Sequence, residues 1–181
     1  DFVVPAKNME FNITESGIQY QAGIKDHGQV SGDMTRHALR QVSADLNVPL
    51  KFTDMLMDED KPLLEYVLNE RAHSSTHQRM LRTIDNKMVG NVSPSFSRLY
   101  DNDIIFKALL PAITGSEFEV QSCNMNDQMM HLSLTSEKLK GEVKVGDIVQ
   151  GGIKMRNSGV GASRMMFARL AYRLWCLNGC T

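Results

Sequence analysis

The sequence predicts an α+β fold in which N-terminal helices are followed by a mainly antiparallel sheet in β-β-α-β-β-β order. Apolar residues recur at helical spacing through much of 35–73, whereas after residue 74 they alternate with polar residues in short runs typical of strands. These runs mostly follow one another directly, which favours antiparallel pairing. We expect one domain over 1–181, with an N-terminal hairpin and loop (1–34), a helical part (35–73) and a sheet-rich part (78–181).

The first elements rest on local signals. Weak alternation over residues 9–25 predicts a hairpin, and the Gly, Asp and Ser residues of 26–33 predict a loop. Thr35 can cap the first helix, which must end before Pro49 because the residue before a proline disfavours the α conformation.

Two further helices complete the helical part. One covers about 50–58. The next begins at Lys61-Pro62, since proline is tolerated in the first turn of a helix, and runs to about Ala72.

The sheet-rich part begins with a hairpin around the polar turn Asp85-Asn86. A helix follows, capped near Asp101 and ended by Pro111. The remaining predicted strands are 117–124, 128–135 and 147–156, followed by a loop at 157–163. The last stretch, 164–177, fits a helix and a strand equally well, and the sequence leaves it open.

Composition excludes several classes of protein. The chain has 181 residues, 42% of them hydrophobic, and this is enough for a sizeable core and too much for a disordered chain. No apolar run reaches the roughly 18 residues of a membrane span, and no signal segment opens the chain. Three cysteines cannot all pair within the chain, which favours a reducing, cytoplasmic location. The chain ends suggest a piece of a longer protein.

The charge is unevenly distributed along the chain. The 20 Lys and Arg against 21 Asp and Glu give a net charge of −1, which argues against a globally basic nucleic-acid binder. However, residues 148–181 contain five basic side chains and no acidic one, whereas 54–70 contains six acidic side chains against Lys61. The sequence therefore predicts an acidic middle and a basic end.

The basic end contains the candidate binding residues. The loop 157–163 holds small residues whose backbone N–H groups could bind phosphate, or whose glycines could simply supply the positive φ angles of a turn. Arginines interleaved with aromatic residues suit a single-stranded nucleic-acid groove, or else a buried aromatic core with a solvated arginine edge. The candidates for nucleic-acid contact are Lys154, Arg156, Asn157, Ser158, Gly159, Gly161, Arg164, Arg169 and Arg173, with Phe167 and Tyr172 as possible stacking residues.

Metal and catalytic sites have little support in the sequence. Cys176 and Cys180 form one loose pair, whereas a structural zinc site has two tight pairs, so buried thiols are the simpler interpretation. The acidic run 58–60 is interpreted as a solvated helix face, and no nucleophile motif occurs. We therefore expect no cofactor, no metal and no enzymatic activity.

The C-terminal segment resembles a known family. Asn157-Ser158-x-x-Gly161, followed by Arg173-Leu-Trp-Cys176-Leu-Asn178-Gly179, is similar to a signature of the phage/plasmid-like proteins catalogued as domain of unknown function 932. Met80-Leu81-Arg82-Thr83 and Tyr100-Asp101-Asn102 resemble its central block, although Asn86 replaces the usual turn glycine. The similarity covers about residues 30 to 180.

The resemblance implies a phage, prophage or plasmid context. The order of elements is also similar, more remotely, to that of Rad52-like single-strand annealing proteins. We therefore expect a non-enzymatic single-stranded DNA-binding protein of phage or mobile-element recombination that self-associates into a homo-oligomer, with a phage exonuclease or a host single-strand-binding protein as further partners. The alternative is a phage protein-interaction module that acts on a host complex.

Overall fold

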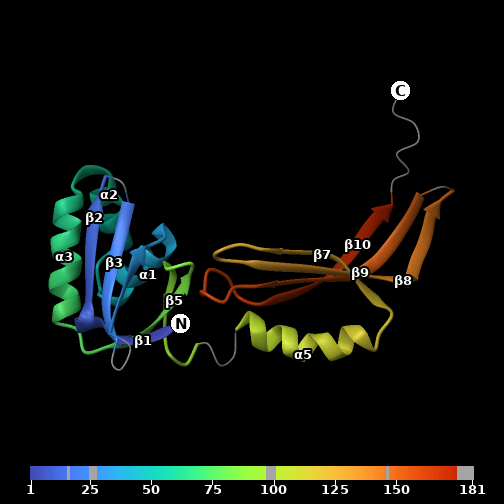
Figure 1. Cartoon of the computed structure of the whole chain (residues 1–181). Helices are drawn as coiled ribbons and strands as arrows, with labels where there is room; N and C mark the ends of the chain where they lie inside the picture. The colour runs from blue at the N-terminus through green and yellow to red at the C-terminus, as the bar shows by residue number, and fades with distance from the viewer. Residues whose placement is uncertain (16, 25–27, 97–100, 146, 175–181) are drawn as a thin grey trace. The chain divides into compact units, whose positions relative to one another are not determined.

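The computed structural model describes residues 1–15, 17–24, 28–96, 101–145 and 147–174. The chain forms two compact units, Asp1–Ser97 and Arg98–Thr181, instead of the one domain that the sequence suggested (Figure 1). Each unit is described by itself below.

The first unit begins with strands, so the predicted order with helices first is wrong. Four strands precede the first α-helix. In chain order the elements are β1 (Phe2–Pro5), the 3-10 helix η1 (Ala6–Asn8), β2 (Met9–Thr14), β3 (Gly17–Ile24), β4 (Gly28–Asp33), α1 (Arg36–Asp45), α2 (Leu50–Glu59), α3 (Lys61–His73), β5 (Gln78–Ile84) and β6 (Lys87–Val92).

These strands make two antiparallel sheets, ordered β1-β5-β6 and β2-β3-β4. The hairpin predicted over 9–25 is β2 and β3, while β4 replaces much of the predicted loop 26–33. No residue of β4 is fully buried, and its mostly polar and glycine residues lack the alternation of buried apolar residues that β2 has. That is why its sequence resembles a loop.

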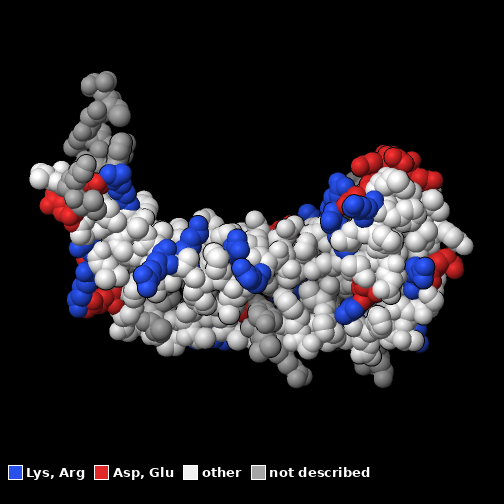
Figure 2. All heavy atoms as spheres, turned by 180° about the vertical axis from the view of Figure 1, so that it is seen from behind, with Lys and Arg blue, Asp and Glu red and all other residues white. Residues whose placement is uncertain are grey.

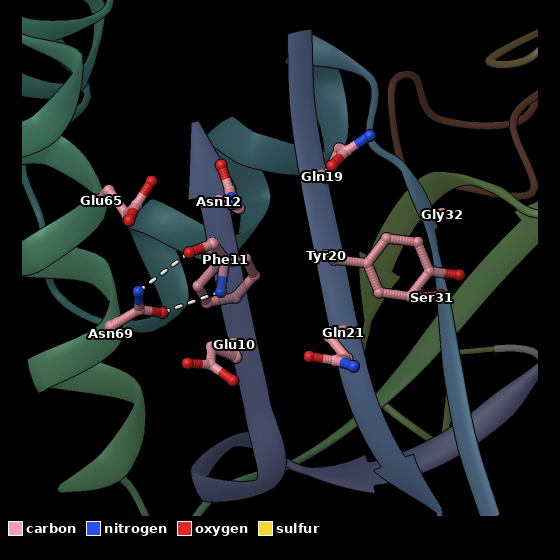
Figure 3. Close-up of a pocket in the computed structure, with 10 residues that line it drawn as sticks. All are labelled: Glu10, Phe11, Asn12, Gln19, Tyr20, Gln21, Ser31, Gly32, Glu65 and Asn69. Atoms are coloured by element: carbon pink, nitrogen blue, oxygen red, sulfur yellow. Dashed lines mark hydrogen bonds between the residues drawn. The ribbon is translucent and has the colours of Figure 1, made fainter. Parts of the chain in front are cut away.

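Helix α3 covers the edge of β2 with side chains in place of a neighbouring strand (Figure 3). Asn69 accepts a hydrogen bond from the Phe11 N–H at 2.8 Å and donates one to the Phe11 carbonyl at 2.9 Å. One turn earlier in the helix, Glu65 accepts from the Ile13 N–H at 2.7 Å. These contacts satisfy backbone groups that an unpaired edge would leave open.

We expect Asn69→Leu to lower the free energy of unfolding by about 2 kcal/mol, because the Phe11 N–H and C=O then lose their partner in a partly buried place. Urea unfolding followed by circular dichroism measures this change. Glu70→Leu is the matched control, since Glu70 is exposed on the same helix, and it should change stability by less than about 0.5 kcal/mol. Equal effects of the two substitutions would contradict the bridging role.

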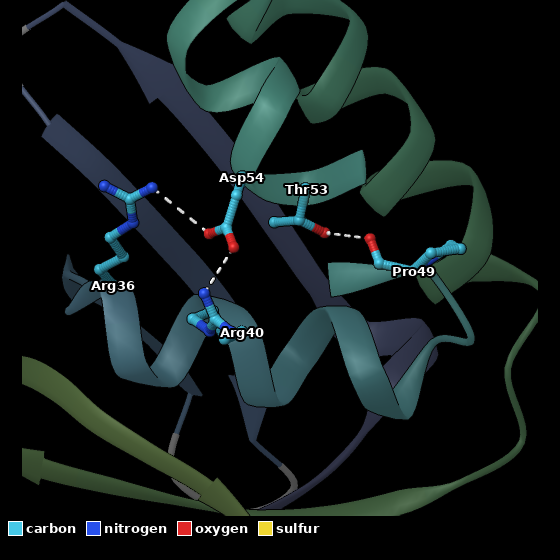
Figure 4. Close-up of polar contacts among 5 residues, drawn as sticks. All are labelled: Arg36, Arg40, Pro49, Thr53 and Asp54. Carbon is cyan, nitrogen blue, oxygen red and sulfur yellow. Dashed lines mark hydrogen bonds and ion pairs between the residues drawn. The ribbon is translucent and has the colours of Figure 1, made fainter. Parts of the chain in front are cut away.

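Some acidic side chains of residues 54–70 form hydrogen bonds within the first unit. Asp54 of α2 accepts hydrogen bonds from Arg36 and Arg40 of α1, at 3.3 and 2.5 Å (Figure 4). Asp60 caps α3 by accepting from the Leu63 N–H. With Glu65 bound to β2, three of the six acidic side chains of 54–70 already have roles in the fold.

The second unit is one helix against a four-stranded antiparallel sheet. Its elements are α5 (Asn102–Thr114), β7 (Phe118–Met125), β8 (Met130–Lys144), β9 (Asp147–Asn157) and β10 (Met166–Leu174), and the sheet order is β10-β9-β8-β7. The segment that the sequence left open is therefore a strand over 166–174. Four strands, not three, follow the helix.

Helix α5 continues past Pro111, where the sequence predicted its end. A proline within a helix removes one backbone donor. Here the last turn is held by the Thr114 hydroxyl, which donates to the Leu110 carbonyl at 2.7 Å, and by the Gly115 N–H, which donates to the Pro111 carbonyl. Ile113 also packs against the apolar cluster of the sheet, so the extra turn gains burial.

No helix in the described part of the chain is long and apolar enough to cross a membrane.

Candidate nucleic-acid interface

The sheet of the second unit has two different faces. Met130, Leu132 and Leu134 of β8 and Met155 of β9 are buried in one cluster with Ile105 of α5. We call this side the helix face. The opposite side, whose residues alternate with these along each strand, is called the open face.

Lys154 and Arg156 of β9 lie on the open face, because they alternate with Met155. Lys154 is directly opposite Ser133 of β8, and Arg156 is opposite His131. Lys154 is exposed and Arg156 is half-buried. Neither forms an ion pair with a described residue, so their charges are free to attract an anion.

The strand β10 places Arg169 and Arg173 on the helix face. Phe167 is opposite Met155 and Arg169 is opposite Ile153. Arg173 lies opposite Val149, which is an even number of positions along β9 from Ile153 and Met155 and so lies on the same face. Residues directly opposite each other in an antiparallel pair point to the same side of the sheet. The nine predicted contacts therefore do not line one groove, and the prediction of a single groove is corrected.

Arg173 is occupied in an ion pair at the end of the sheet. Its Nε and Nη2 donate to the two oxygens of Asp147, at 2.6 and 2.5 Å. These hydrogen bonds hold the pKa of the Asp147 carboxyl below its usual range and raise the pKa of Arg173. Arg169 is exposed and has no ion-pair partner among the described residues.

Arg173→Gln should raise the pKa of Asp147 toward its ordinary value, because the hydrogen-bonding cation is lost. A carboxyl whose pKa is depressed by folding adds stability above its unfolded pKa, and this is lost as the pH falls through the folded pKa. A carboxyl-detected NMR titration measures the shift. Arg169→Gln, on the same strand, should leave the pKa of Asp147 unchanged. An equal rise of the Asp147 pKa in this control would show that the carboxyl responds to net charge and not to the hydrogen bonds from Arg173.

The loop after β9 is fastened to the fold. Asn157 is 1% exposed, and its amide donates to the Asn102 side chain of α5 at 2.7 Å. Ser158 is equally buried, and its hydroxyl accepts from the Ala162 N–H at 2.8 Å. Gly161 has φ 71°, which supports the interpretation as a tight turn. Asn157, Ser158 and the buried Gly159 therefore serve the turn rather than a surface, which corrects their assignment as phosphate contacts.

The two candidate stacking residues are also on different faces. Tyr172 is opposite Gln150 on the open face and 40% exposed, whereas Phe167 on the helix face is 55% exposed. Arg164 is exposed in the segment that joins β9 to β10. Figure 2 shows separate Lys and Arg side chains across the middle of the second unit, and basic and acidic side chains mixed at its outer end. The open face thus includes Lys154, Arg156 and Tyr172, and Tyr172 lies beside Gln150, four residues further along β9 from Lys154.

His131 and Ser133 belong to the same face and were not proposed from the sequence. Their signal was present, since they alternate with the apolar Met130, Leu132 and Leu134 along one strand. The alternation alone did not show that these two residues lie beside Arg156 and Lys154, because this depends on the pairing of β8 with β9.

A separate polar hollow of about 430 Å³ lies on the first unit, over β2, β3 and β4 beside α3 (Figure 3). Glu10 and Glu65 are among its lining residues, and the lining contains no Lys, Arg or His. Such a surface repels phosphate, so it is not part of the candidate interface.

The remaining residues considered in the sequence are not among those of the open face and the polar hollow. Cys123 is an exposed free thiol. Within the described ranges no group of three or more His, Cys, Asp and Glu could hold a metal ion. Trp175 and the Cys176–Gly179 part of the motif, together with Cys180, Tyr100 and Ser16, lie outside the described residues.

Comparisons with family models, with curated proteins and with solved structures each find no match to this chain.

Proposed function

We propose that the second unit binds single-stranded nucleic acid on the open face of its sheet. The observation that supports this most directly is the placement of Lys154 and Arg156 side by side along β9, without ion-pair partners among the described residues. An open antiparallel sheet with basic and aromatic side chains is a platform on which phosphates are held and bases stack.

Each residue then has a role set by its position. Lys154 and Arg156 attract two phosphates, and Tyr172 offers its ring to a base on the same face. His131 and Ser133, in the next strand, supply hydrogen bonds. Glu119 of β7 is on this face as well, opposite Thr135, but it lies two strands away from β9. In the context that the family resemblance implies, the strand is DNA handled during phage or mobile-element recombination in the bacterial cytoplasm.

Charge reversal tests the proposal. Lys154→Glu with Arg156→Glu should weaken binding of a fluorescent oligo-dT about tenfold or more at low salt, and should flatten the salt dependence, because two phosphate contacts are lost. Fluorescence anisotropy at several salt concentrations measures both quantities. The matched control is Lys107→Glu with Lys138→Glu, which makes the same change in net charge at exposed lysines paired with Asp103 and Glu117.

The control variant should bind nearly as well as the natural chain. Equal weakening by both pairs would show that only net charge matters, and no binding by the natural chain at low salt would reject the proposal.

The second candidate is a protein-interaction module acting on a host complex, and exposed apolar side chains favour it. Leu110 of α5, Val120 and Met125 of β7 and Phe167 of β10 are each more than half exposed, at 60%, 54%, 68% and 55%. If Leu110→Ser with Met125→Ser abolishes capture of a host protein that the natural chain retains, while the oligonucleotide does not bind, this candidate replaces the first.

A further inference from the structure

Strand β10 is an edge strand of its sheet, and its pairing with β9 is regular along its whole length. It pairs with β9 over nine residues without a register shift, and β9 is its only neighbour among the described strands. A long regular edge offers a row of backbone N–H and C=O groups to another strand.

The opposite edge of the same sheet is protected. β7 contains a register shift between Val120 and Ser122, where Gln121 has no direct partner on β8. Such a bulge bends the strand and interrupts the pattern that a second strand would need. The sheet therefore has one edge suited to pairing.

We propose that two copies of the chain pair antiparallel through β10, with Leu170 of each copy opposite Leu170 of the other, and so join their sheets. This assembly needs no nucleic acid, and it stands whether or not the open face binds DNA.

Charge selects this register. Only registers that keep matching faces together are acceptable, because a slip of one residue would place opposite faces side by side. In the register centred on Leu170, Arg169 is opposite Ala171 and Arg173 is opposite Phe167. A shift of the centre to Arg169 would place Arg169 opposite itself, and a shift to Ala171 would place Arg169 opposite Arg173. Like charges directly opposite each other destabilise a strand pair.

The Leu170-centred register also supplies favourable contacts. Phe167 is 55% exposed on the helix face of the single chain, and Arg173 of the second copy would lie directly across from it. The Arg173 guanidinium is held by Asp147, so the contact would be made by the apolar stem of the arginine against the ring. Because pairing uses backbone groups, Lys154 and Arg156 would stay accessible on the open face of both copies.

Cysteine cross-linking tests the register in the full chain with Cys123, Cys176 and Cys180 changed to serine. Directly opposite residues of antiparallel strands have Cα atoms about 4.5–5.5 Å apart, within reach of a disulfide. Leu170→Cys should therefore give a covalent dimer on mild oxidation. Ala168→Cys, on the same face, would be about 13 Å from its counterpart, four residues along the strand, and should not cross-link.

A charge pair at Ala171 tests the same contact without disulfides. Ala171 is exposed and opposite Arg169 of the second copy. Sedimentation of the chain without DNA should show several-fold tighter association for Ala171→Glu and several-fold weaker association for Ala171→Arg. A monomeric natural chain at all concentrations, equal cross-linking at 168 and 170, or the reverse order of the two Ala171 variants would overturn the proposal.

Discussion

Gly32→Ala is expected to lower the free energy of unfolding by about 3 kcal/mol or more. A Cβ atom at Gly32 would lie 1.8 Å from the carbonyl oxygen of Asn86, in the turn between β5 and β6. That oxygen belongs to the backbone, so no rotation of a side chain can relieve the contact. The β5–β6 turn would have to move away from β4, and the two sheets of the first unit would lose packing between them.

Gly23→Ala is the matched control for this prediction. Gly23 lies in the neighbouring strand β3, and a Cβ there would come no closer than 3.9 Å to Asn8, which is an ordinary contact. Both substitutions restrict the unfolded chain equally, so their difference isolates the contact with Asn86. Urea unfolding should show Gly23→Ala within about 1 kcal/mol of the natural chain. Similar midpoints for the two variants would mean that β4 and the turn are not in close contact.

The sequence predicted the elements that carry their own local signals. Thr35 caps α1, since its hydroxyl accepts from the Ala38 N–H at 3.1 Å. The two-residue turn Asp85-Asn86 forms as predicted, with φ of 48° and 63° at its residues. Both features depend on a few adjacent residues, which is why the sequence alone was enough.

The elements that depend on a neighbour were missed. β4 has no fully buried residue, and a polar strand and a loop look alike in sequence. β10 has apolar residues at both helical and strand spacing, and the nine-residue pairing with β9 selects the strand. Intrinsic preference is a weak guide where tertiary pairing is available.

The candidate site shows the same limit. The sequence identified the basic residues of β9 and β10 but not which of them share a face. In the β9–β10 pairing Met166 is opposite Arg156, so even-numbered residues of both strands share the open face and odd-numbered ones the helix face. Lys154 and Arg156 are therefore separated from Arg169 and Arg173. A register shifted by one residue would have moved Arg169 and Arg173 to the open face. The composition of the strands does not predict the register.

Gly152→Ala is expected to destabilise the second unit by about 3 kcal/mol or more, comparable to the change at Gly32. A Cβ at Gly152 would lie 2.0 Å from the Leu134 carbonyl oxygen and 3.0 Å from the Leu134 carbonyl carbon. The close approach arises because β8 has a bulge here: its pairing with β9 passes from Thr135 opposite Gly152 to Lys140 opposite Gln150. The extra residues of β8 need a partner without a side chain.

Gly141→Ala, on β8 itself, is the control, because a Cβ there meets nothing within 4 Å. Thermal unfolding should show a large loss for Gly152→Ala and little change for Gly141→Ala. Gly152 lies two residues from Lys154 on the open face, so the strain should reach the proposed interface. A folded Gly152→Ala chain should then bind oligo-dT more weakly than Gly141→Ala at a temperature where both are native. Weaker binding without loss of charge would show that the spacing of the open face matters as well as its sign, whereas unchanged stability would mean that β8 does not approach β9 so closely.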